Sequence, residues 1–289
     1  FPVSGKSVKS TLYSVPDCQS IVKKAIVDRL SDVYSRRARL PESGAEYPIE
    51  VSILKDEVSL TIDTSGSSLF KRGYRTEKGG APIKENMAAS LIKLTSWFPD
   101  KPFYDPTCGS GTIPIEAALI GLNIAPGLQR SFISEDWNIF AADEWKTLRT
   151  EAKMAANYDV ELDILGTDLD QNMIEIAKRN AEKAGVEDFI EFRQLALKDF
   201  KTDKEYGVIV SNPPYGERLD DQEYVENLYK QIGQAFKPLE TWSKYIITSD
   251  LNFEEFYGQR ATKKRKLYNG RLRTDYFQFW GKRRPRPNK

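Results

Sequence analysis

Apolar and polar residues follow one pattern in the first part of this chain and a different pattern in the rest. Residues 17–34 carry apolar side chains at helical spacing, and Asp17 is the expected N-cap of that helix. Residues 48–54 and 57–63 alternate apolar and polar positions, which predicts a β-hairpin. One helix and two strands bury too little surface to fold alone. We therefore expect residues 1–65 to be the end of a small domain that starts further upstream.

The remaining chain predicts a connecting segment followed by a larger domain. Residues 66–82 are rich in Gly, Ser and Lys, as is typical of a linker or a lid, and residues 83–289 form the larger domain. Its expected helices are 83–98, 113–122, 171–184 and 222–236, and its expected strands are 102–104, 162–167, 189–193, 207–211 and 244–248. This order predicts an α/β fold with a mostly parallel, doubly wound sheet. Two final runs flank Asn269-Gly270, which predicts an antiparallel hairpin at the C-terminal edge of the sheet.

The composition is that of a globular protein and removes several classes of function. Of the 289 residues, 40% are hydrophobic and 29% are charged, and no apolar run is long enough to span a membrane. The sequence has neither an initial Met nor an apolar signal core, so we expect a natural start upstream and no secretion. Two cysteines cannot build a disulfide framework, and a reducing cytoplasm is the expected location. Histidine is absent, which excludes Ser-His-Asp and Cys-His catalysis within this chain and predicts no metal site.

The net charge of +1 conceals a strongly basic C-terminal end. From Arg260 to Lys289 there are twelve Lys or Arg residues and one acid, Asp275, so this end is expected to contact a polyanion. Because side chains alternate faces along a strand, we expect roughly half of the basic residues to contact the phosphates of that polyanion. A surface made basic for solubility, with a solvated tail at residues 283–289, is the alternative. The candidates for phosphate contact are Arg72, Arg75, Lys263, Lys264, Arg265, Lys266, Arg271 and Arg273.

A short segment with two glycines, between a predicted strand and a predicted helix, is the first candidate site. It consists of Asp105, Pro106, Thr107, Cys108, Gly109, Ser110, Gly111 and Thr112. Open α/β sheets bind ligands beyond the ends of such strands, and glycine lets a ligand approach the backbone. A dinucleotide motif would need a third glycine where Pro114 stands, and a Walker A loop would need a lysine. Asp105 would repel a pyrophosphate but suits a cationic ligand such as S-adenosylmethionine. A glycine-rich turn that binds nothing is the alternative.

Two acidic residues follow the next predicted strand. Asp168 and Asp170 come directly after residues 162–167, where α/β nucleotide folds place an acid that accepts ribose hydroxyls. The interval from Asp105 is longer than usual because residues 123–160 look inserted. We expect Asp168 to bind the ribose and Asp170 to cap the following helix.

The tetrapeptide Asn212-Pro213-Pro214-Tyr215 is the candidate catalytic site. Consecutive prolines cannot continue a central strand, so they predict a rigid turn after residues 207–211. The Asn212 side-chain oxygen and a proline carbonyl can accept hydrogen bonds from a planar NH2 group. Tyr215 offers a face on which a nucleobase can stack. Such a site would orient an exocyclic amine for attack on an electrophilic methyl group. Taken alone, the tetrapeptide could also be an ordinary turn.

The three motifs DPTCGSGT, GTDLD and NPPYGERL together resemble the Rossmann-like class I, S-adenosylmethionine-dependent methyltransferases that act on amino groups. The strings KRGYRTEKGGAPIKENMAASLI and APGLQRSFISEDW are similar to a narrower family, the THUMP-domain bacterial methylases that form N2-methylguanine in 23S ribosomal RNA. Members are often labelled N6-adenine-specific DNA methylases. The resemblance covers essentially the whole chain. It implies the C-terminal part of an α+β, RNA-binding THUMP domain over residues 1–65 and a methyltransferase domain over residues 83–289, with ribosomal RNA as the partner.

The same resemblance implies roles for individual residues. By position, the cofactor loop falls on residues 105–112 and the target-amine site on residues 212–215, while residues 79–85 match the segment over the methionine end of the cofactor. The contacts to S-adenosylmethionine that it implies outside the glycine loop are Pro82, Asp168, Leu169, Ala196 and Asn212. Many relatives carry an Asp before the small residue that follows the third strand. Leu195 stands there in this chain, so a backbone contact near Ala196 is expected instead.

Other functions remain open from the sequence. N6-adenine methylation of DNA fits, because the tetrapeptide can bind any exocyclic amine on a planar ring, although the THUMP-like segment favours RNA. A non-catalytic RNA-binding or ribosome assembly factor could keep the same fold. A Cys108 nucleophile, as in cytosine-C5 methylation, is disfavoured because an amine with a lone pair needs no covalent activation. Glu217 is a candidate acceptor for the proton that the amine loses.

Overall fold

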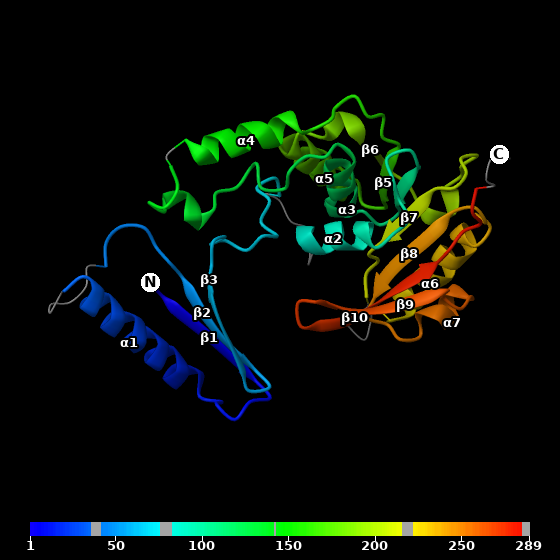
Figure 1. The fold of residues 1–289 in the computed structure, drawn as a ribbon. Helices are drawn as coiled ribbons and strands as arrows, with labels where there is room; N and C mark the ends of the chain where they lie inside the picture. The colour runs from blue at the N-terminus through cyan, green and yellow to red at the C-terminus, as the bar shows by residue number, and fades with distance from the viewer. Residues whose placement is uncertain (36–41, 76–82, 142, 216–221, 285–289) are drawn as a thin grey trace, which may run out of the picture. The chain divides into compact units, whose positions relative to one another are not determined.

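The computed structural model describes residues 1–35, 42–75, 83–141, 143–215 and 222–284, and the chain divides into two compact units (Figure 1). Residues Phe1–Leu69 and Arg130–Thr150 form the first unit. Residues Phe70–Gln129 and Glu151–Lys289 form the second. Within the described residues, no helix is both long and apolar enough to cross a membrane.

A three-stranded sheet and a helix make up most of the first unit. The strands β1 (Val3–Val8), β2 (Ile49–Leu54) and β3 (Glu57–Ile62) lie in that order, and helix α1 (Val15–Val33) follows β1. Strands β2 and β3 form the predicted antiparallel hairpin. Strand β1 was not predicted and pairs with β2 in parallel. Its sequence VSGKSV has too few apolar residues to indicate a strand by itself, so the pairing partner decides its conformation.

Residues 130–150 belong to the same unit although they come from the segment that looks inserted. The Trp137 indole stacks on Tyr47 with ring centroids 4.8 Å apart, and its Nε1 donates to the Glu46 carbonyl at 2.8 Å. The Arg130 guanidinium donates to the backbone carbonyls of Ser65, Ser67 and Ser68. These contacts join segments that are far apart in the sequence, and no local pattern announced them.

The second unit is built on a seven-stranded sheet in the order β6-β5-β4-β7-β8-β10-β9. Its strands are β4 (Phe103–Asp105), β5 (Ile164–Asp168), β6 (Glu191–Gln194), β7 (Val208–Ser211), β8 (Ser243–Thr248), β9 (Lys263–Asn269) and β10 (Leu272–Phe279). The first five strands are parallel, and β10 is antiparallel to both β8 and β9. This confirms the predicted parallel sheet with an antiparallel hairpin at its C-terminal edge.

Helices cover both faces of this sheet (Figure 1). The helices of this unit are α2 (Glu85–Lys93), α3 (Thr112–Gly121), α5 (Gln171–Ala184), α6 (Gln222–Phe236) and α7 (Phe253–Tyr257), with 3-10 turns η2 (Glu187–Phe189) and η3 (Leu197–Asp199). The 3-10 turn η1 (Ile133–Asp136) belongs to the first unit, and α4 (Glu144–Met154) begins in the first unit and ends in the second. Helices α5 and α6 have the predicted bounds, α2 is shorter than predicted, and α4 and α7 were not predicted.

Alternating side chains of the strands enter two separate apolar cores. Phe103 of β4 and Val208 of β7 pack in the core beside α2, α3 and α5. Their neighbours Tyr104 and Ile209 pack in the core beside α6 and α7. Both faces are buried, so these strands are continuously apolar, as is usual for parallel sheets covered on both sides.

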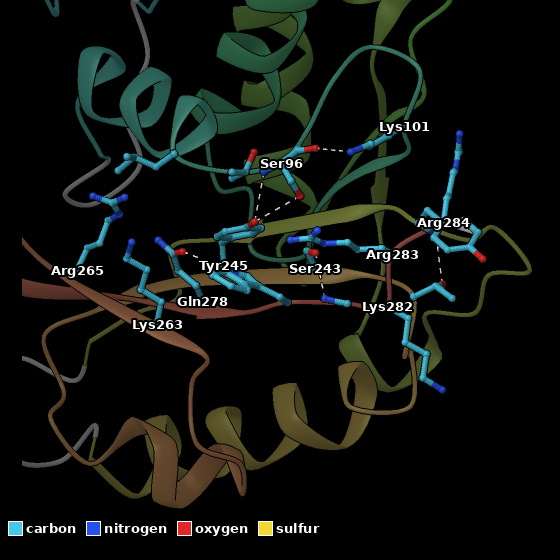
Figure 2. Close-up of a pocket in the computed structure, with 16 residues that line it drawn as sticks. Ser96, Lys101, Ser243, Tyr245, Lys263, Arg265, Gln278, Lys282, Arg283 and Arg284 are labelled. Carbon is cyan, nitrogen blue, oxygen red and sulfur yellow. Dashed lines mark hydrogen bonds between the residues drawn. The ribbon is translucent and has the colours of Figure 1, made fainter. Parts of the chain in front are cut away.

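The parallel strands point all the candidate motifs toward one edge of the sheet. The carboxyl ends of β4, β5 and β7 lead into the glycine loop, Asp168 and the tetrapeptide 212–215, respectively. Ligands bind at this edge in open α/β sheets. At the opposite edge, where β8 begins and β10 ends, a pocket of about 580 Å³ is lined by residues of β8, β9 and β10 (Figure 2).

Candidate active site

The glycine loop turns sharply between β4 and α3, and its two glycines have different roles. Gly109 and Gly111 both have positive φ, +50° and +82°, which favours glycine at both positions. A Cβ on Gly111 would lie 2.9 Å from the Ala177 Cβ, so this glycine lets α3 pack against α5. A Cβ on Gly109 would meet no atom of the described residues within 4 Å. The backbone at Gly109 therefore borders open space that a ligand can occupy.

A valine at Gly109 should fill this space, and we expect Gly109→Val to abolish measurable binding of S-adenosylhomocysteine. Gly185 is a matched control, because its φ is +70° and a Cβ there also meets nothing within 4 Å, but it ends helix α5 instead. Gly185→Val should carry a similar backbone strain of about 1–2 kcal/mol and keep its affinity. Calorimetric titration, with melting curves for both variants, tests this. Equal affinities in the two variants would place the ligand elsewhere.

Asp105 is a buried carboxyl group at the end of β4. Its side chain is only 1% exposed, and its Oδ1 accepts a hydrogen bond from the Thr107 backbone nitrogen at 3.2 Å. Burial raises the pKa of Asp105 well above its ordinary value, and the charge of Asp168 raises it further. A positively charged ligand group beside it would compensate the cost of this buried charge. Asp105 is therefore suited to hold an ammonium group.

Asp168 connects the ends of β4 and β5. Its Oδ2 accepts from the Gly109 nitrogen at 3.0 Å, and its Oδ1 accepts from the Asp170 nitrogen at 3.0 Å. Each carboxylate oxygen has a further lone pair that can accept from a hydroxyl group. Asp170 accepts from the Asn172 nitrogen at 2.8 Å and caps α5, which confirms its predicted capping role. A ribose contact by Asp168 remains a prediction.

The tetrapeptide 212–215 begins directly after β7 and is held by contacts on two sides. The Tyr215 hydroxyl donates to the Asn212 Oδ1 at 2.5 Å, so the amide oxygen predicted to accept from the substrate already has a local donor. The Tyr229 hydroxyl donates to the Pro214 carbonyl at 3.3 Å and lies 2.7 Å from the Thr248 hydroxyl. Burial raises the pKa of Tyr229 to about 12, so its hydroxyl stays protonated as a donor. Sequence reasoning missed Tyr229, because only the fold brings α6 to this turn.

A hydrogen bond brings the glycine loop and the tetrapeptide together. The Thr107 hydroxyl lies 2.9 Å from that of Ser211, the residue before Asn212. The Asn180 amide donates to the Ser110 carbonyl at 3.0 Å and supports the loop from α5. A methyl donor on this loop would therefore lie beside the site predicted to hold the amine.

Other predicted cofactor contacts lie around Asp168 or outside the described residues. Leu169 is 57% exposed, and the turn containing Ala196 begins where the Leu195 nitrogen donates to the Asp168 carbonyl at 3.1 Å. Pro82, most of the matched segment 79–85 and Glu217 lie outside the described residues. Burial raises the pKa of the Cys108 thiol well above its ordinary value, which disfavours a thiolate nucleophile.

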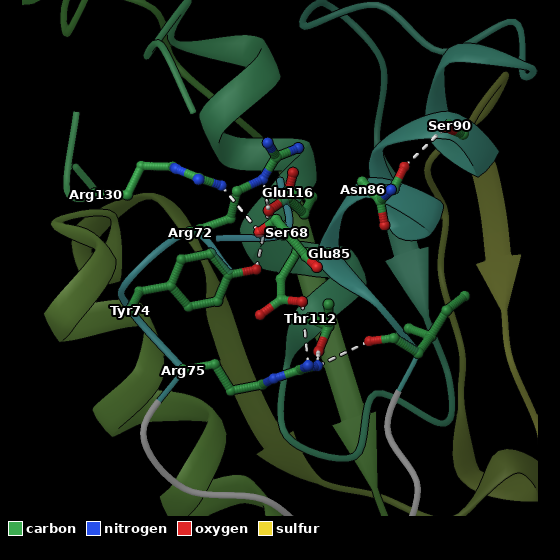
Figure 3. A network of polar contacts seen from close by, with 11 residues as sticks. Ser68, Arg72, Tyr74, Arg75, Glu85, Asn86, Ser90, Thr112, Glu116 and Arg130 are labelled. Carbon is green, nitrogen blue, oxygen red and sulfur yellow. Dashed lines mark hydrogen bonds and ion pairs between the residues drawn. The ribbon is translucent and has the colours of Figure 1, made fainter. Parts of the chain in front are cut away.

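A buried polar network beside the glycine loop corrects the expectation for two arginines (Figure 3). Arg72 lies 3.5 Å from Glu116, and its side chain is 12% exposed. Arg75 lies 3.1 Å from Glu85, and its side chain is 7% exposed. Both were predicted to contact phosphate, but each forms an ion pair with a carboxylate of a neighbouring helix. Releasing either one would leave a buried charge without its partner, which is costly.

The same network ties the segment before α2 to the glycine loop. The Arg75 Nη1 donates to the Ile83 carbonyl at 2.8 Å and lies 3.4 Å from the Thr112 hydroxyl, at the end of the glycine loop. The Tyr74 hydroxyl donates to Glu116 at 3.0 Å. Burial raises the pKa of Glu116 to about 7 against the opposing effect of the arginine beside it. A lone acid in the apolar run TIPIEAALI was the available sequence signal for this network.

The basic side chains of the β9–β10 hairpin lie on both of its faces and at different points along its length. Lys263 and Arg265 line the pocket that begins at the opposite edge, and the strand register places Arg265 level with Ile247 near the carboxyl end of β8. Lys264 lies 2.7 Å from Glu254, and Lys266 lies over the Tyr268 ring. The hairpin turn extends beyond the end of β8, on the same side as the motifs, because Asp275 pairs with Thr248.

Arg271 and Arg273 are at this turn, and Arg273 lies 3.4 Å from Asp275. We expect Arg271→Glu with Arg273→Glu to weaken RNA binding and to lower the slope of log affinity against log salt, because phosphate contacts release counterions. The affinity for S-adenosylhomocysteine should not change. Filter binding over a salt series measures both quantities, and a slope equal to that of the wild type would exclude the turn from the RNA surface.

The strand order and these loops define the class of protein. Five parallel strands with a terminal antiparallel hairpin carry a glycine loop after β4, an acid after β5 and Asn-Pro-Pro-Tyr after β7. This is the arrangement of a Rossmann-like class I methyltransferase. Within the described residues, no group of three or more Cys, Asp and Glu side chains could hold a metal ion.

Comparison with protein families agrees and is more specific. Residues 72–278 match the family described as RMKL-like, methyltransferase domain, and residues 1–63 match the THUMP domain. The chain belongs to the RMKL-like methyltransferase family and carries a THUMP domain.

Two relatives illustrate the range of the family. The "Putative RNA methyltransferase YpsC" of Bacillus subtilis (strain 168) is 59% identical over 100% of this chain and 75% of its own length. A "Ribosomal RNA large subunit methyltransferase K/L" of Shewanella baltica (strain OS185) is 38% identical over 87% of this chain. The match covers 36% of that longer protein.

Two solved structures have the same fold over nearly the whole chain. One is titled a predicted N6-adenine-specific DNA methylase from Listeria monocytogenes str. 4b F2365, with 62% identity and a TM-score of 0.90 over 98% of this chain and 73% of that one. The other is SMU.472, titled a putative methyltransferase complexed with SAH, with 53% identity and a TM-score of 0.88. That match covers 98% of this chain and 75% of SMU.472.

Proposed function

We propose that this chain transfers a methyl group from S-adenosylmethionine to the exocyclic N2 amine of a guanine in large-subunit ribosomal RNA. The observation that carries the proposal is the Thr107–Ser211 hydrogen bond of 2.9 Å, which sets the glycine loop beside the Asn-Pro-Pro-Tyr turn. The names of the relatives support an RNA substrate, and the THUMP domain at residues 1–63 supports it independently.

The residues at this edge fit the cofactor. Asp105 would hold its ammonium group, the open space at Gly109 would admit it, and Asp168 would accept from its ribose hydroxyls. When bound, S-adenosylmethionine supplies an electrophilic methyl group on a sulfonium sulfur. The structure of SMU.472, titled as a complex with SAH, supports this assignment.

The Asn-Pro-Pro-Tyr turn would orient the target amine. The Asn212 Oδ1 and the Pro213 carbonyl would accept its two N–H groups, which points the nitrogen lone pair toward the methyl. For this the Tyr215 hydroxyl must share or release the Asn212 oxygen, leaving the tyrosine ring free to stack on the guanine. The amine nitrogen held by Asn212 and Pro213 would form its bond to the methyl carbon as the methyl–sulfur bond breaks, with S-adenosylhomocysteine as the leaving group, and the methylated amine would then lose one proton to water. Positioning contributes most of the rate in such a mechanism.

N6-adenine methylation of DNA is the second candidate, because the Listeria structure at 62% identity carries that title. Incubating the protein with labelled S-adenosylmethionine and, in parallel, unmodified ribosomal RNA and plasmid DNA separates the candidates. Label in N2-methylguanosine is the expected result. Label in N6-methyldeoxyadenosine would favour the second candidate, and no label in either polymer would favour a binding or assembly factor.

A further inference from the structure

The pocket that begins at the sheet edge opposite the candidate active site is strongly basic (Figure 2). It lies where β8 begins at Ser243 and where the chain leaves β10 at Trp280. Figure 2 shows Lys263 and Arg265 at one end of this basic pocket and Lys282 and Arg284 at the other, with Arg283 between them. The cations that line it are Lys101, Lys263, Arg265, Lys282, Arg283 and Arg284, and no acidic residue among those that the structure describes lines it.

Three of the six cations are already engaged. Lys282 pairs with Glu240, Arg284 lies 3.7 Å from Asp100, and Lys101 donates to the Ser96 carbonyl at 2.5 Å. The other three have neither an ion pair nor a side-chain hydrogen bond within the described part of the chain, and they are Lys263, Arg265 and Arg283. Three such charges around one cavity repel each other unless an anion neutralises them.

Two further side chains make the pocket suitable for a nucleic acid strand. Gln278 is 2% exposed and lines the pocket, and its Nε2 has no hydrogen-bond partner among the described residues, which a phosphate oxygen could supply. Trp280 is 54% exposed, and its Nε1 donates to the Gln278 Oε1 at 3.4 Å, so the indole is held with one part open to solvent. Cations along a groove beside an exposed aromatic ring are the usual elements of single-strand recognition.

We propose that this basic pocket binds phosphates of a single-stranded stretch of the RNA substrate, with Trp280 available to stack on a base. The inference rests on the proposed function, because that function makes the ligand an RNA. The pocket extends from the start of β8 to Arg265, which the strand register places level with Ile247 near the carboxyl end of β8, so the same RNA would be held along β9 as well as at the amine site. Lys263 and Arg265, but not Lys264 and Lys266, would then be the effective cations of β9.

The test compares two variants of the full chain that lose the same charge from the same strand. In the pocket variant, Lys263→Gln is combined with Arg265→Gln. In the control variant, Lys264→Gln is combined with Lys266→Gln, whose side chains lie outside the pocket. Binding of a labelled single-stranded oligoribonucleotide is measured over a salt series, and melting curves and S-adenosylhomocysteine titration check the fold of each variant.

We expect the pocket variant to bind on the order of tenfold more weakly, with a log–log salt slope smaller by about 1.4, corresponding to two lost phosphate contacts on a single strand. The control variant should bind within about twofold of the wild type. Arg283→Gln alone should lower the slope by about half as much.

Equal losses in the two double variants would show that only the overall charge of the hairpin matters and would overturn the proposal. Binding of inorganic pyrophosphate is measured on the same variants. If the pocket variant loses pyrophosphate binding but keeps its RNA affinity, the pocket is a small-anion site and the proposal is overturned. If the wild type binds RNA but the pocket variant binds equally well, the pocket proposal alone fails. If the wild type binds and methylates no RNA, both the pocket proposal and the proposed function fail.

Discussion

Asn212→Ala is expected to lower the rate of methyl transfer by about two orders of magnitude or more, the usual effect of removing a preorganised hydrogen-bonding group. The alanine removes the oxygen that would accept from the target amine, and it also leaves the Tyr215 hydroxyl without the acceptor at 2.5 Å. Cofactor affinity should remain, because Asp105, Gly109 and Asp168 are unchanged. RNA affinity should largely remain, because phosphate contacts dominate it.

A matched control for this variant is Asn227→Ala, which removes an exposed amide from α6. Single-turnover transfer at saturating cofactor and RNA separates the chemical step from binding, and calorimetry gives the cofactor affinity of each variant. Asn227→Ala should behave as the wild type. Wild-type single-turnover rates in Asn212→Ala would show that the chemistry takes place elsewhere on the protein.

Asp105→Ala is expected to weaken the binding of S-adenosylhomocysteine by about 1.5–3 kcal/mol, which is roughly 10- to 150-fold, because a charge-assisted contact to the ligand ammonium is lost. The buried carboxyl also predicts a pH dependence. In the free protein the pKa of Asp105 is raised well above its ordinary value, and a bound ammonium group would lower it again. At pH values between the pKa of Asp105 in the free protein and its pKa in the complex, binding should therefore release a proton.

The affinity for S-adenosylhomocysteine should increase with pH. Below the raised pKa of the free protein, the carboxyl must lose its proton before it can pair with the ammonium group. Affinity therefore increases with pH through this range and becomes constant above it. The dependence should disappear in Asp105→Ala. Calorimetry in buffers of different ionisation enthalpy counts the released protons, and unchanged affinity in Asp105→Ala would remove Asp105 from the cofactor site.

Much of the methyltransferase unit could be predicted from the sequence because its elements have strong local signals. Helix α5 is bounded by an Asp170 cap and the left-handed Gly185, and both signals lie within the helix's own sequence. The Asn269-Gly270 pair similarly predicted the hairpin β9–β10, although Asn269 pairs with Leu272 and the turn itself consists of Gly270 and Arg271. The short apolar strands are buried on both faces, so their composition identifies them without their neighbours.

The positions of the motifs in the fold could be predicted from the strand topology as much as from the residues of the motifs. Parallel strands place their carboxyl ends at one edge, so a glycine loop after β4 and a tetrapeptide after β7 had to approach each other. The hydrogen bond between the Thr107 and Ser211 hydroxyls shows that the two segments do approach each other. The sequence could predict this proximity, but not the Tyr229 contact that supports the turn from α6.

By itself, the sequence determined the fold class, the order of the elements and the motifs at the sheet edge, because each depends on local propensity or on strand order. The tertiary structure alone decided which charges are available. Arg72 and Arg75 meet buried Glu116 and Glu85, whereas Lys263 and Arg265 face a pocket that no acid of the described residues lines. It also decided that β1 pairs with β2, and that Gly109 borders open space while Gly111 packs against α5. These outcomes depend on partners distant in the chain, and no pattern of neighbouring residues encodes them.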